Sequence, residues 1–177
     1  MVCAMLCSCG AEKNLKKAEK YLALGEYYDA ATQFKQAYTK TSPKEREKRG
    51  QYALKMAYCY EKTNSVQKAV AAYRNAIRYN QADMNHRLAY ARQLLKTADY
   101  KQAATEFKAV VDSMPDNTLA KNGLVSAQNA PQWKKEGSRY TVKRMDVFNS
   151  RRAEFSPVLA GDQYEKLYFT STRNEAQ

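Results

Sequence analysis

The sequence predicts an all-α protein, built as a solenoid of helical hairpins and followed by an incomplete β segment. Three observations support this fold class. Gly and Pro are scarce, at 6 and 4 of 177 residues, which favours helices over loop-rich β structure. A pattern of small and aromatic residues recurs three times between residues 25 and 110. After residue 138 the pattern changes to the alternation of apolar and polar side chains that is typical of strands.

The first nine residues, MVCAMLCSC, carry no charge, and the first charged side chain is Glu12. Such a start is typical of a targeting segment. Residues 6–9 (LCSC) resemble the lipobox of bacterial lipoproteins, in which an aliphatic and two small residues precede the cysteine that is acylated. The resemblance implies cleavage after Ser8 and a membrane anchor on Cys9. The alternative is a Cys-rich terminus of a cytoplasmic protein.

The helical pattern consists of a small residue, an aromatic residue four positions later, and a small or β-branched residue three positions after that. From the second copy to the third the spacing is 34 residues (103 − 69), and from the first to the second it is 39 (69 − 30). The members are Ala30, Phe34 and Ala37; Ala69, Tyr73 and Ala76; and Ala103, Phe107 and Val110. This period and pattern resemble the tetratricopeptide repeat (TPR), which pairs two antiparallel helices.

Each predicted repeat begins with a first helix marked by a small residue, at Ala18, Ala57 and Ala91. Pro43 and Pro115 stand where the first and third repeats should end. The five extra residues (39 − 34) fall at about 42–49 and predict a longer turn or an extended helix start. A last helix at about 117–128, with Leu119, Leu124 and Val125, should cap the array. The predicted TPR domain is therefore 10–130.

TPR arrays hold extended peptides or partner helices against the first helices of their repeats, and the resemblance implies such a groove here. The predicted groove has a leucine at the same position of each repeat, surrounded by polar and charged side chains: Leu15, Glu19 and Leu22; Leu54, Tyr58, Glu61 and Lys62; and Asn85, Leu88, Arg92 and Lys96. Carboxylate-clamp TPRs of co-chaperones carry Lys where these repeated leucines stand, so capture of a C-terminal carboxylate is not expected. Lys62, Arg92 and Lys96 either meet an acidic peptide or form a solvated rim.

The composition argues against several functional classes. The formal net charge is +12, which indicates a basic surface or an acidic partner, but no motif for binding nucleic acid supports that kind of partner. The chain has 1 His, no Gly-rich phosphate loop and no nucleophile–base set, so we expect no enzyme and no cofactor. Three of its 4 Cys lie in the first nine residues, so we expect no disulfide framework. Because His86 is the only histidine, no Cys/His spacing for a metal site exists. Cys59 is predicted to be a core residue.

The C-terminal part is predicted to leave the helical array at Pro131. Residues 131–148 should form a linker and a strand, and 149–177 a hairpin with FSP at 155–157, a turn at 161–162 and the strand LYFTS at 167–171. This segment resembles the opening blade of a bacterial β-propeller. A propeller needs several four-stranded blades, so we expect the sequence to be the N-terminal fragment of a longer protein.

The order of lipobox, TPR array and propeller start resembles the N-terminal part of Bacteroidetes OmpA-family multidomain lipoproteins, PorE-like components of type IX secretion. The resemblance implies a non-catalytic periplasmic scaffold, anchored to the outer membrane through Cys9, in an assembly tethered to peptidoglycan. Binding to peptidoglycan itself would need domains that this chain lacks. The alternative is a soluble cytoplasmic TPR adaptor that binds an acidic or amphipathic peptide.

Overall fold

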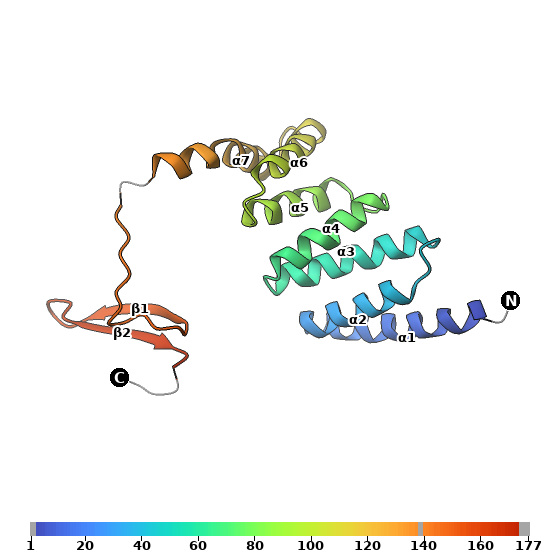
Figure 1. Ribbon diagram of the computed structural model, residues 1–177, viewed down its shortest axis with the longest axis horizontal. Helices are drawn as coiled ribbons and strands as arrows, with labels where there is room; N and C mark the ends of the chain where they lie inside the picture. Colours follow the sequence, from blue (N-terminus) through green and yellow to red (C-terminus); the bar gives the residue numbers. More distant parts are fainter. Residues whose placement is uncertain (1–2, 138–139, 174–177) are drawn as a thin grey trace. The chain divides into compact units, whose positions relative to one another are not determined.

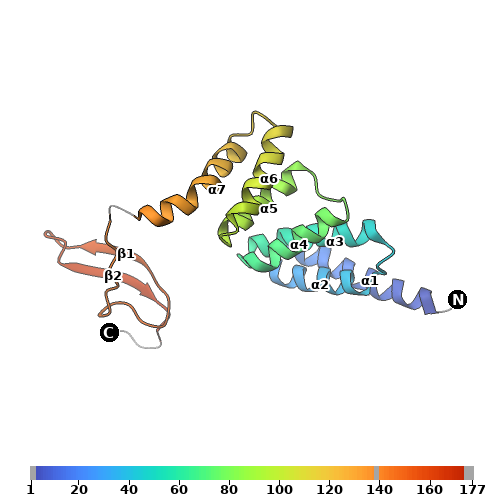
Figure 2. The same ribbon diagram turned by 45° about the horizontal axis from the view of Figure 1, so that its top comes forward.

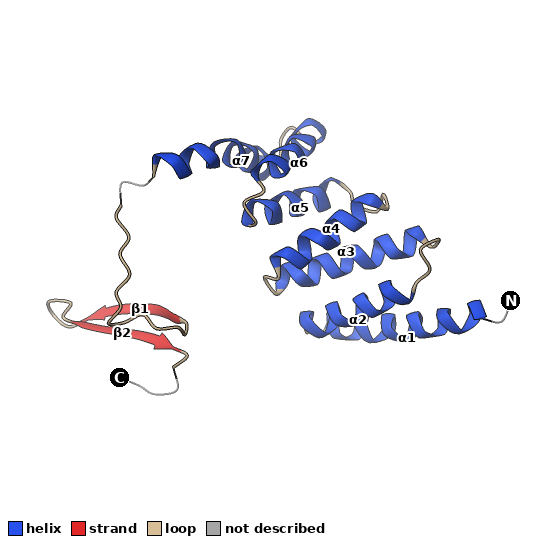
Figure 3. Ribbon diagram, in the orientation of Figure 1, coloured by secondary structure: helices blue, strands red, loops and turns tan. Residues whose placement is uncertain are grey.

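The computed structural model describes residues 3–137 and 140–173, with side chains described from Ala11 onward. The chain divides into two compact units, Met1–Glu136 and Gly137–Gln177. The first unit is helical and the second holds a two-stranded antiparallel sheet, which confirms the predicted fold class (Figure 3). The helices are α1 (Cys3–Ala23), α2 (Tyr27–Lys40), α3 (Arg46–Lys62), α4 (Val66–Arg78), α5 (Met84–Lys96), α6 (Tyr100–Ser113) and α7 (Thr118–Glu136).

The helices of the first unit stack in chain order. Each one packs against the next along the chain, and α5 also contacts α7 (Figures 1 and 2). Contacts between neighbours in sequence are the pattern of a solenoid, in which each repeat covers the apolar face of the one before it.

The predicted repeat pattern forms the core. All nine of its residues are buried, with at most 3% of any of them exposed, and the first-helix alanines Ala18, Ala57 and Ala91 are fully buried. Small side chains at these crossing points let paired helices approach closely, and Phe34, Tyr73 and Phe107 fill the space beside them. Cys59 is a buried free thiol, as predicted, and burial raises its pKa to about 11.

The turns inside the three hairpins share one geometry. Gly25, Asn64 and Ala98 have φ of +74°, +51° and +60°, and they recur at the spacings of the repeats, 39 (64 − 25) and 34 (98 − 64). The residue after each turn donates its backbone N–H to a carbonyl five residues earlier, as Glu26 does to Tyr21 at 2.9 Å. This is the Schellman ending of a helix, which needs a left-handed residue. Glycine and asparagine adopt that conformation readily, but alanine does not.

The extra residues of the first repeat form both predicted features. Residues 41–45 are a longer loop between α2 and α3, and α3 begins early at Arg46. Gly50, in the second turn of α3, permits a close approach, because a Cβ there would lie 2.3 Å from the Cγ of Gln81 and 2.9 Å from the Cβ of Tyr79. The start of α3 therefore lies directly against the end of α4.

The prediction that Pro131 ends the helices is wrong, because α7 includes this residue and continues to Glu136. Proline removes one helical N–H, but its fixed φ is itself helical, so a helix can continue past it at a cost of about 3 kcal/mol. The helix ends instead before Gly137, which has φ of +73°. A glycine in this left-handed conformation is the usual residue after the end of a helix. α7 caps the array through Ala120 and Ala127, which are buried, whereas Leu119 and Val125 are exposed.

The second unit contains the predicted hairpin, β1 (Glu154–Ala160) paired antiparallel with β2 (Lys166–Ser171). A bulge interrupts the pairing between Phe155 and Val158, where Ser156 has φ of +54°. The strand predicted before this hairpin is not present in the described residues 140–148. That segment makes a turn instead, in which the N–H of Asn149 donates to the carbonyl of Met145 at 2.8 Å.

Candidate functional site

The candidate site is the set of predicted groove residues on α1, α3 and α5, the first helices of the repeats. Its apolar members have one face in the core: Leu15, Leu22, Leu54 and Leu88 are partly buried and pack against the central hydrophobic cluster. The remaining part of each side chain is accessible. The three repeated leucines therefore supply an apolar strip that continues the core to the surface of the first helices.

An ion pair links the first helices of repeats one and two. Lys55 of α3 donates from Nζ to a carboxylate oxygen of Glu19 on α1, and the same Nζ lies 5.5 Å from the centre of the Phe34 ring. Both side chains of the pair are about two-fifths exposed, at 41% and 43%, so the pair adds at most about 1 kcal/mol. Glu19 is thus neutralised within the protein. Lys55 was not among the predicted residues, although it follows Leu54 on the same helix.

Tyr58 offers an aromatic surface beside a cation. Its side chain is 43% exposed, and the ammonium of Lys62 lies 5.3 Å from its ring centre. On another side the Tyr27 ring meets it edge to face, with ring centres 5.9 Å apart. A cation over a ring and an edge-to-face pair both hold an aromatic side chain in place. Tyr58 is therefore a fixed, half-exposed ring.

Glu61, Tyr73 and Arg92 come together where repeats two and three meet. The Tyr73 hydroxyl donates to a Glu61 carboxylate oxygen at 2.8 Å. Burial raises the pKa of Tyr73 well above its ordinary value, the Glu61 carboxylate raises it further, and the positive charge of Arg92 opposes both. The carboxylate of Glu61 is therefore already engaged, as that of Glu19 is.

The remaining predicted residues, Asn85, Arg92 and Lys96, are exposed on α5. Lys62, Arg92 and Lys96 form no ion pair with any residue of the described chain. Both acidic groups of the site have partners, whereas three of its cations lack a carboxylate. The surface of α3 and α5 is therefore net positive, with leucines and a tyrosine between the charges.

The predicted lipidation site is not tested by the structure. Cys9 belongs to α1 by its backbone, and its side chain lies outside the described part. Among the described residues there is no group of Cys, His, Asp and Glu that could hold a metal ion, and no helix combines the length and apolarity needed to cross a membrane.

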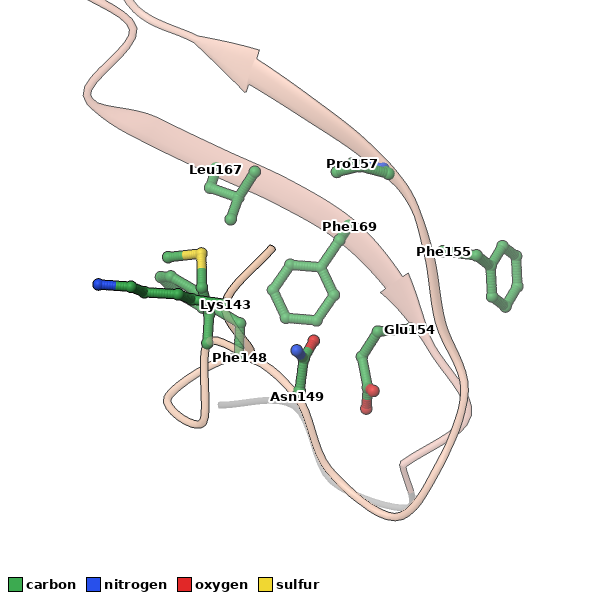
Figure 4. Close-up of a pocket in the computed structure, with 9 residues that line it drawn as sticks. Lys143, Phe148, Asn149, Glu154, Phe155, Pro157, Leu167 and Phe169 are labelled. Atoms are coloured by element: carbon green, nitrogen blue, oxygen red, sulfur yellow. The ribbon is translucent and has the colours of Figure 1, made fainter. Parts of the chain in front are cut away.

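The second unit has a small apolar pocket of about 270 Å³, beside the hairpin (Figure 4). Met145, Phe148, Pro157, Leu167 and Phe169 line it, and the Phe148 and Phe169 rings meet edge to face at 6.2 Å. The guanidinium of Arg173 lies over the Phe169 ring, 5.8 Å from its centre, and donates to a Glu154 carboxylate oxygen at 3.1 Å. None of these five apolar side chains is fully buried, so the pocket is an accessible apolar cluster beside the hairpin.

Comparison with known proteins identifies the fold of the first unit. No family model and no curated protein matches the chain. Among solved structures, the first TPR domain of Spaghetti (RPAP3), bound to the HSP90 peptide SRMEEVD, matches at TM-score 0.55 and 18% identity, over 71% of this chain and 95% of that one. The C-terminal TPR-containing domain of a Plasmodium falciparum FK506-binding protein matches at TM-score 0.60 and 13% identity, over 74% and 94%.

The TPR domain of Sgt2 from Aspergillus fumigatus matches at TM-score 0.53 and 17% identity, over 80% of this chain and 91% of that one. At such identities the likeness concerns the fold. The first unit is a TPR-like solenoid, which confirms the fold that the repeat pattern predicts.

Proposed function

We propose that the chain is a non-catalytic scaffold that binds a segment of a partner protein along α1, α3 and α5. The observation that carries this proposal is the composition of the first-helix surface. Leu15, Leu54 and Leu88 are each partly accessible at the same position of successive repeats. A strip of apolar side chains with this regular spacing suits an extended peptide or one face of an amphipathic helix. The RPAP3 domain, which has the same fold, is bound to a peptide.

The charges define the chemistry of the bound segment. The carboxylate of Glu19 is paired with the ammonium of Lys55, and that of Glu61 accepts a hydrogen bond from the Tyr73 hydroxyl, whereas Lys62, Arg92 and Lys96 have no carboxylate partner in the described chain. A partner segment with Asp or Glu beside apolar residues would complement both properties of the surface. Leucines stand where carboxylate-clamp repeats have lysines, so the acidic groups would come from side chains within the segment.

Selection from a displayed library of random peptides tests this proposal, because the surface itself then chooses the chemistry of the bound segment. Peptides enriched on the full chain should combine acidic and apolar residues. Arg92→Glu with Lys96→Glu should weaken their binding at least about tenfold, since each lost charge contact is worth roughly 1 kcal/mol or more. The control variant, Lys35→Glu with Lys101→Glu, changes the net charge by the same amount on the exposed surfaces of α2 and α6. It should have little effect on the affinity for these peptides. Equal losses in the two variants would contradict the proposal.

We further propose that this scaffold works in the bacterial envelope, attached to the outer membrane by an acyl chain on Cys9 and joined to a β-propeller. The support is the order of the LCSC motif, the TPR array and the FSP and LYFTS strands, which resembles that of OmpA-family lipoproteins of type IX secretion. The half-exposed Phe155 and the exposed Val158 and Tyr168 of the hairpin are consistent with a sheet face that further strands would cover.

The mass of the native product and the modification of its N-terminal peptide test the envelope proposal. Acyl chains on Cys9, and a mass far above 20.2 kDa, are the expected result. An unmodified Met1 with a mass near 20.2 kDa would contradict it and favour the cytoplasmic adaptor.

A further inference from the structure

Three arginines surround one tyrosine at the edge of the TPR unit where α2 and α4 end and α3 begins. The guanidinium carbons of Arg78, Arg46 and Arg49 lie 5.2, 5.4 and 6.0 Å from the centre of the Tyr79 ring. Figures 1 and 2 show these three helix ends on the same side of the stack. The close approach at Gly50 brings them together, since α3 there lies against the residues that follow α4. We call these four residues the arginine cluster.

The hydrogen bonds within the cluster use few of its donors. Arg49 donates to the carbonyl of Thr41 at 3.0 Å, Arg46 to the carbonyl of Arg78 at 3.2 Å, and Arg78 to the Tyr79 hydroxyl at 3.5 Å. Each guanidinium has five N–H groups, so most of them remain available. The buried Nε of Arg49 has no hydrogen-bond partner. The cluster is therefore held in place by the protein but not saturated by it.

The positive charge of the cluster is not neutralised by the described protein. Arg46, Arg49 and Arg78 form no ion pair there. Of the two acidic residues beside Arg46, Glu45 is engaged by Lys48 at 2.6 Å, and Glu47 accepts a hydrogen bond from the side-chain amide of Gln51 at 3.4 Å. The C-terminal ends of α2 and α4 contribute roughly half a negative charge each, against three full positive charges. The pKa of Tyr79 is lowered, first by the Tyr38 hydroxyl and then by Arg49 and Arg78, which agrees with a positive potential at this position.

We propose that the arginine cluster binds a phosphate group. Planar guanidinium groups bind tetrahedral oxyanions with pairs of N–H donors, and three of them can contact different oxygens of one dianion. The Tyr79 hydroxyl already accepts a hydrogen bond from Arg78, so the phosphate contacts would come mainly from the guanidinium groups. The start of α3, whose Glu45 cap makes no side-chain hydrogen bond to the helix, also favours negative charge. This site shares no residue with the first-helix surface, so either proposal can fail without the other.

The phosphate can belong to a soluble phosphomonoester or to a lipid headgroup, and two arms of one experiment distinguish them. The first arm titrates inorganic phosphate into the full chain at about pH 8, where phosphate is mainly a dianion, with ionic strength held constant by chloride. Backbone amide shifts of Tyr79 and side-chain Nε–H shifts of Arg49 report binding. The second arm measures sedimentation with phosphatidylcholine vesicles, with and without phosphatidic acid.

Arg46→Gln with Arg78→Gln removes the two exposed arginines and keeps the partly buried Arg49 that supports the loop. We expect saturable phosphate binding that this variant weakens at least about tenfold. The matched control, Arg151→Gln with Arg152→Gln, removes two exposed arginines of the second unit and should stay within about twofold of the original. Tyr79→Phe keeps the ring and should weaken binding only a few-fold.

Binding to phosphatidic acid vesicles that depends on Arg46 and Arg78 would assign the phosphate to a lipid. Phosphate binding without such vesicle binding would assign it to a soluble ligand, and both results support the site. Shifts that do not saturate, or equal losses in the two double variants, would overturn the proposal. Circular dichroism of each variant shows whether a loss of binding reflects a loss of fold.

Discussion

At the scale of single residues, the three hairpin turns show how one geometry tolerates different side chains. Gly25 and Asn64 suit the left-handed conformation, whereas Ala98 adopts it with φ of +60° against its preference. The left-handed conformation costs an ordinary residue roughly 1–2 kcal/mol. The third turn therefore carries a local strain that the other two lack.

Ala98→Gly should relieve this strain and raise the free energy of unfolding by about 0.5–1 kcal/mol. The gain is smaller than the strain, because glycine also adds entropy to the unfolded chain. Denaturant unfolding measures the change. Ala71→Gly, on the exposed surface of α4, is the control and should lower stability by about 1 kcal/mol. A loss of stability in Ala98→Gly would show that the turn is not strained.

The Tyr73 hydroxyl is a second residue-scale feature, because it engages the Glu61 carboxylate from a buried ring. Tyr73→Phe keeps the ring and removes the donor. We expect a loss of about 1–2 kcal/mol, the range for a hydrogen bond to a charged group that is itself half exposed. The control Tyr28→Phe, on a tyrosine that is 70% exposed, should change the free energy of unfolding by no more than about 0.5 kcal/mol. Equal effects in thermal unfolding would mean that the bond to Glu61 contributes nothing.

At the scale of elements, the repeat pattern predicted the helical hairpins correctly because its residues are the ones that are buried where helices pack together. Ala30, Ala69 and Ala103 stand where helices cross, and no larger residue fits there without moving the pair. The pattern could not predict where α7 ends. Proline weakens a helix by a finite amount, whereas the sequence-based prediction treated it as a certain end of the helix.

The segment 140–148 shows a second limit of sequence patterns. Alternating Tyr140 and Val142 predicted a strand, but the described sheet consists of β1 and β2, and this segment is not one of its strands. The periodicity of a sequence indicates which face of a segment is apolar, but not whether another strand lies beside that segment. The hairpin after residue 153 was predictable, since its two strands are adjacent in sequence and pair with each other.

Packing between α6 and α7 depends on a close approach at Gly123. A Cβ on Gly123 would lie 2.3 Å from Cε1 of the fully buried Phe107. Gly123→Ala should therefore lower stability by about 1–2 kcal/mol. Overpacking costs roughly 1–3 kcal/mol, which exceeds the gain of up to about 1 kcal/mol in helix propensity.

The neighbouring change Asn122→Ala is the control for this prediction. Asn122 is exposed on the same helix, so the substitution should be neutral or slightly stabilising. Differential scanning calorimetry compares the two variants. If Gly123→Ala gains stability as Asn122→Ala does, α7 does not pack against Phe107 as described.

At the scale of the whole molecule, the candidate site was only partly predictable. The position of the leucines on the first helices follows from the repeat period, because equivalent positions of stacked hairpins face the same way. The repeat period does not predict which charged side chains lack a partner of opposite charge. Lys55 pairs with Glu19, and the Tyr73 hydroxyl donates to Glu61, through contacts between helices, and these contacts leave Lys62, Arg92 and Lys96 without a carboxylate partner in the described chain.

The net charge of +12 makes salt an independent probe of this surface. Binding of an acidic peptide to Lys62, Arg92 and Lys96 should weaken as ionic strength rises, because exposed charges are screened over about 10 Å at 0.1 M salt. The Arg92→Glu with Lys96→Glu variant should lose most of this salt dependence, whereas Lys35→Glu with Lys101→Glu should keep it. Fluorescence anisotropy of a selected peptide gives both slopes, and identical slopes would place the binding elsewhere.

Photo-crosslinking from the first-helix surface in the producing cells tests the central claim most directly. Benzoylphenylalanine in place of Tyr58, on α3, should give a discrete adduct with a partner protein, and the adduct should fade when Arg92 and Lys96 are changed to Glu. The same probe in place of Tyr28, exposed on α2, should not give that adduct. The same adduct from both positions, or one that Arg92→Glu and Lys96→Glu leave unchanged, would contradict a partner-binding surface on α1, α3 and α5.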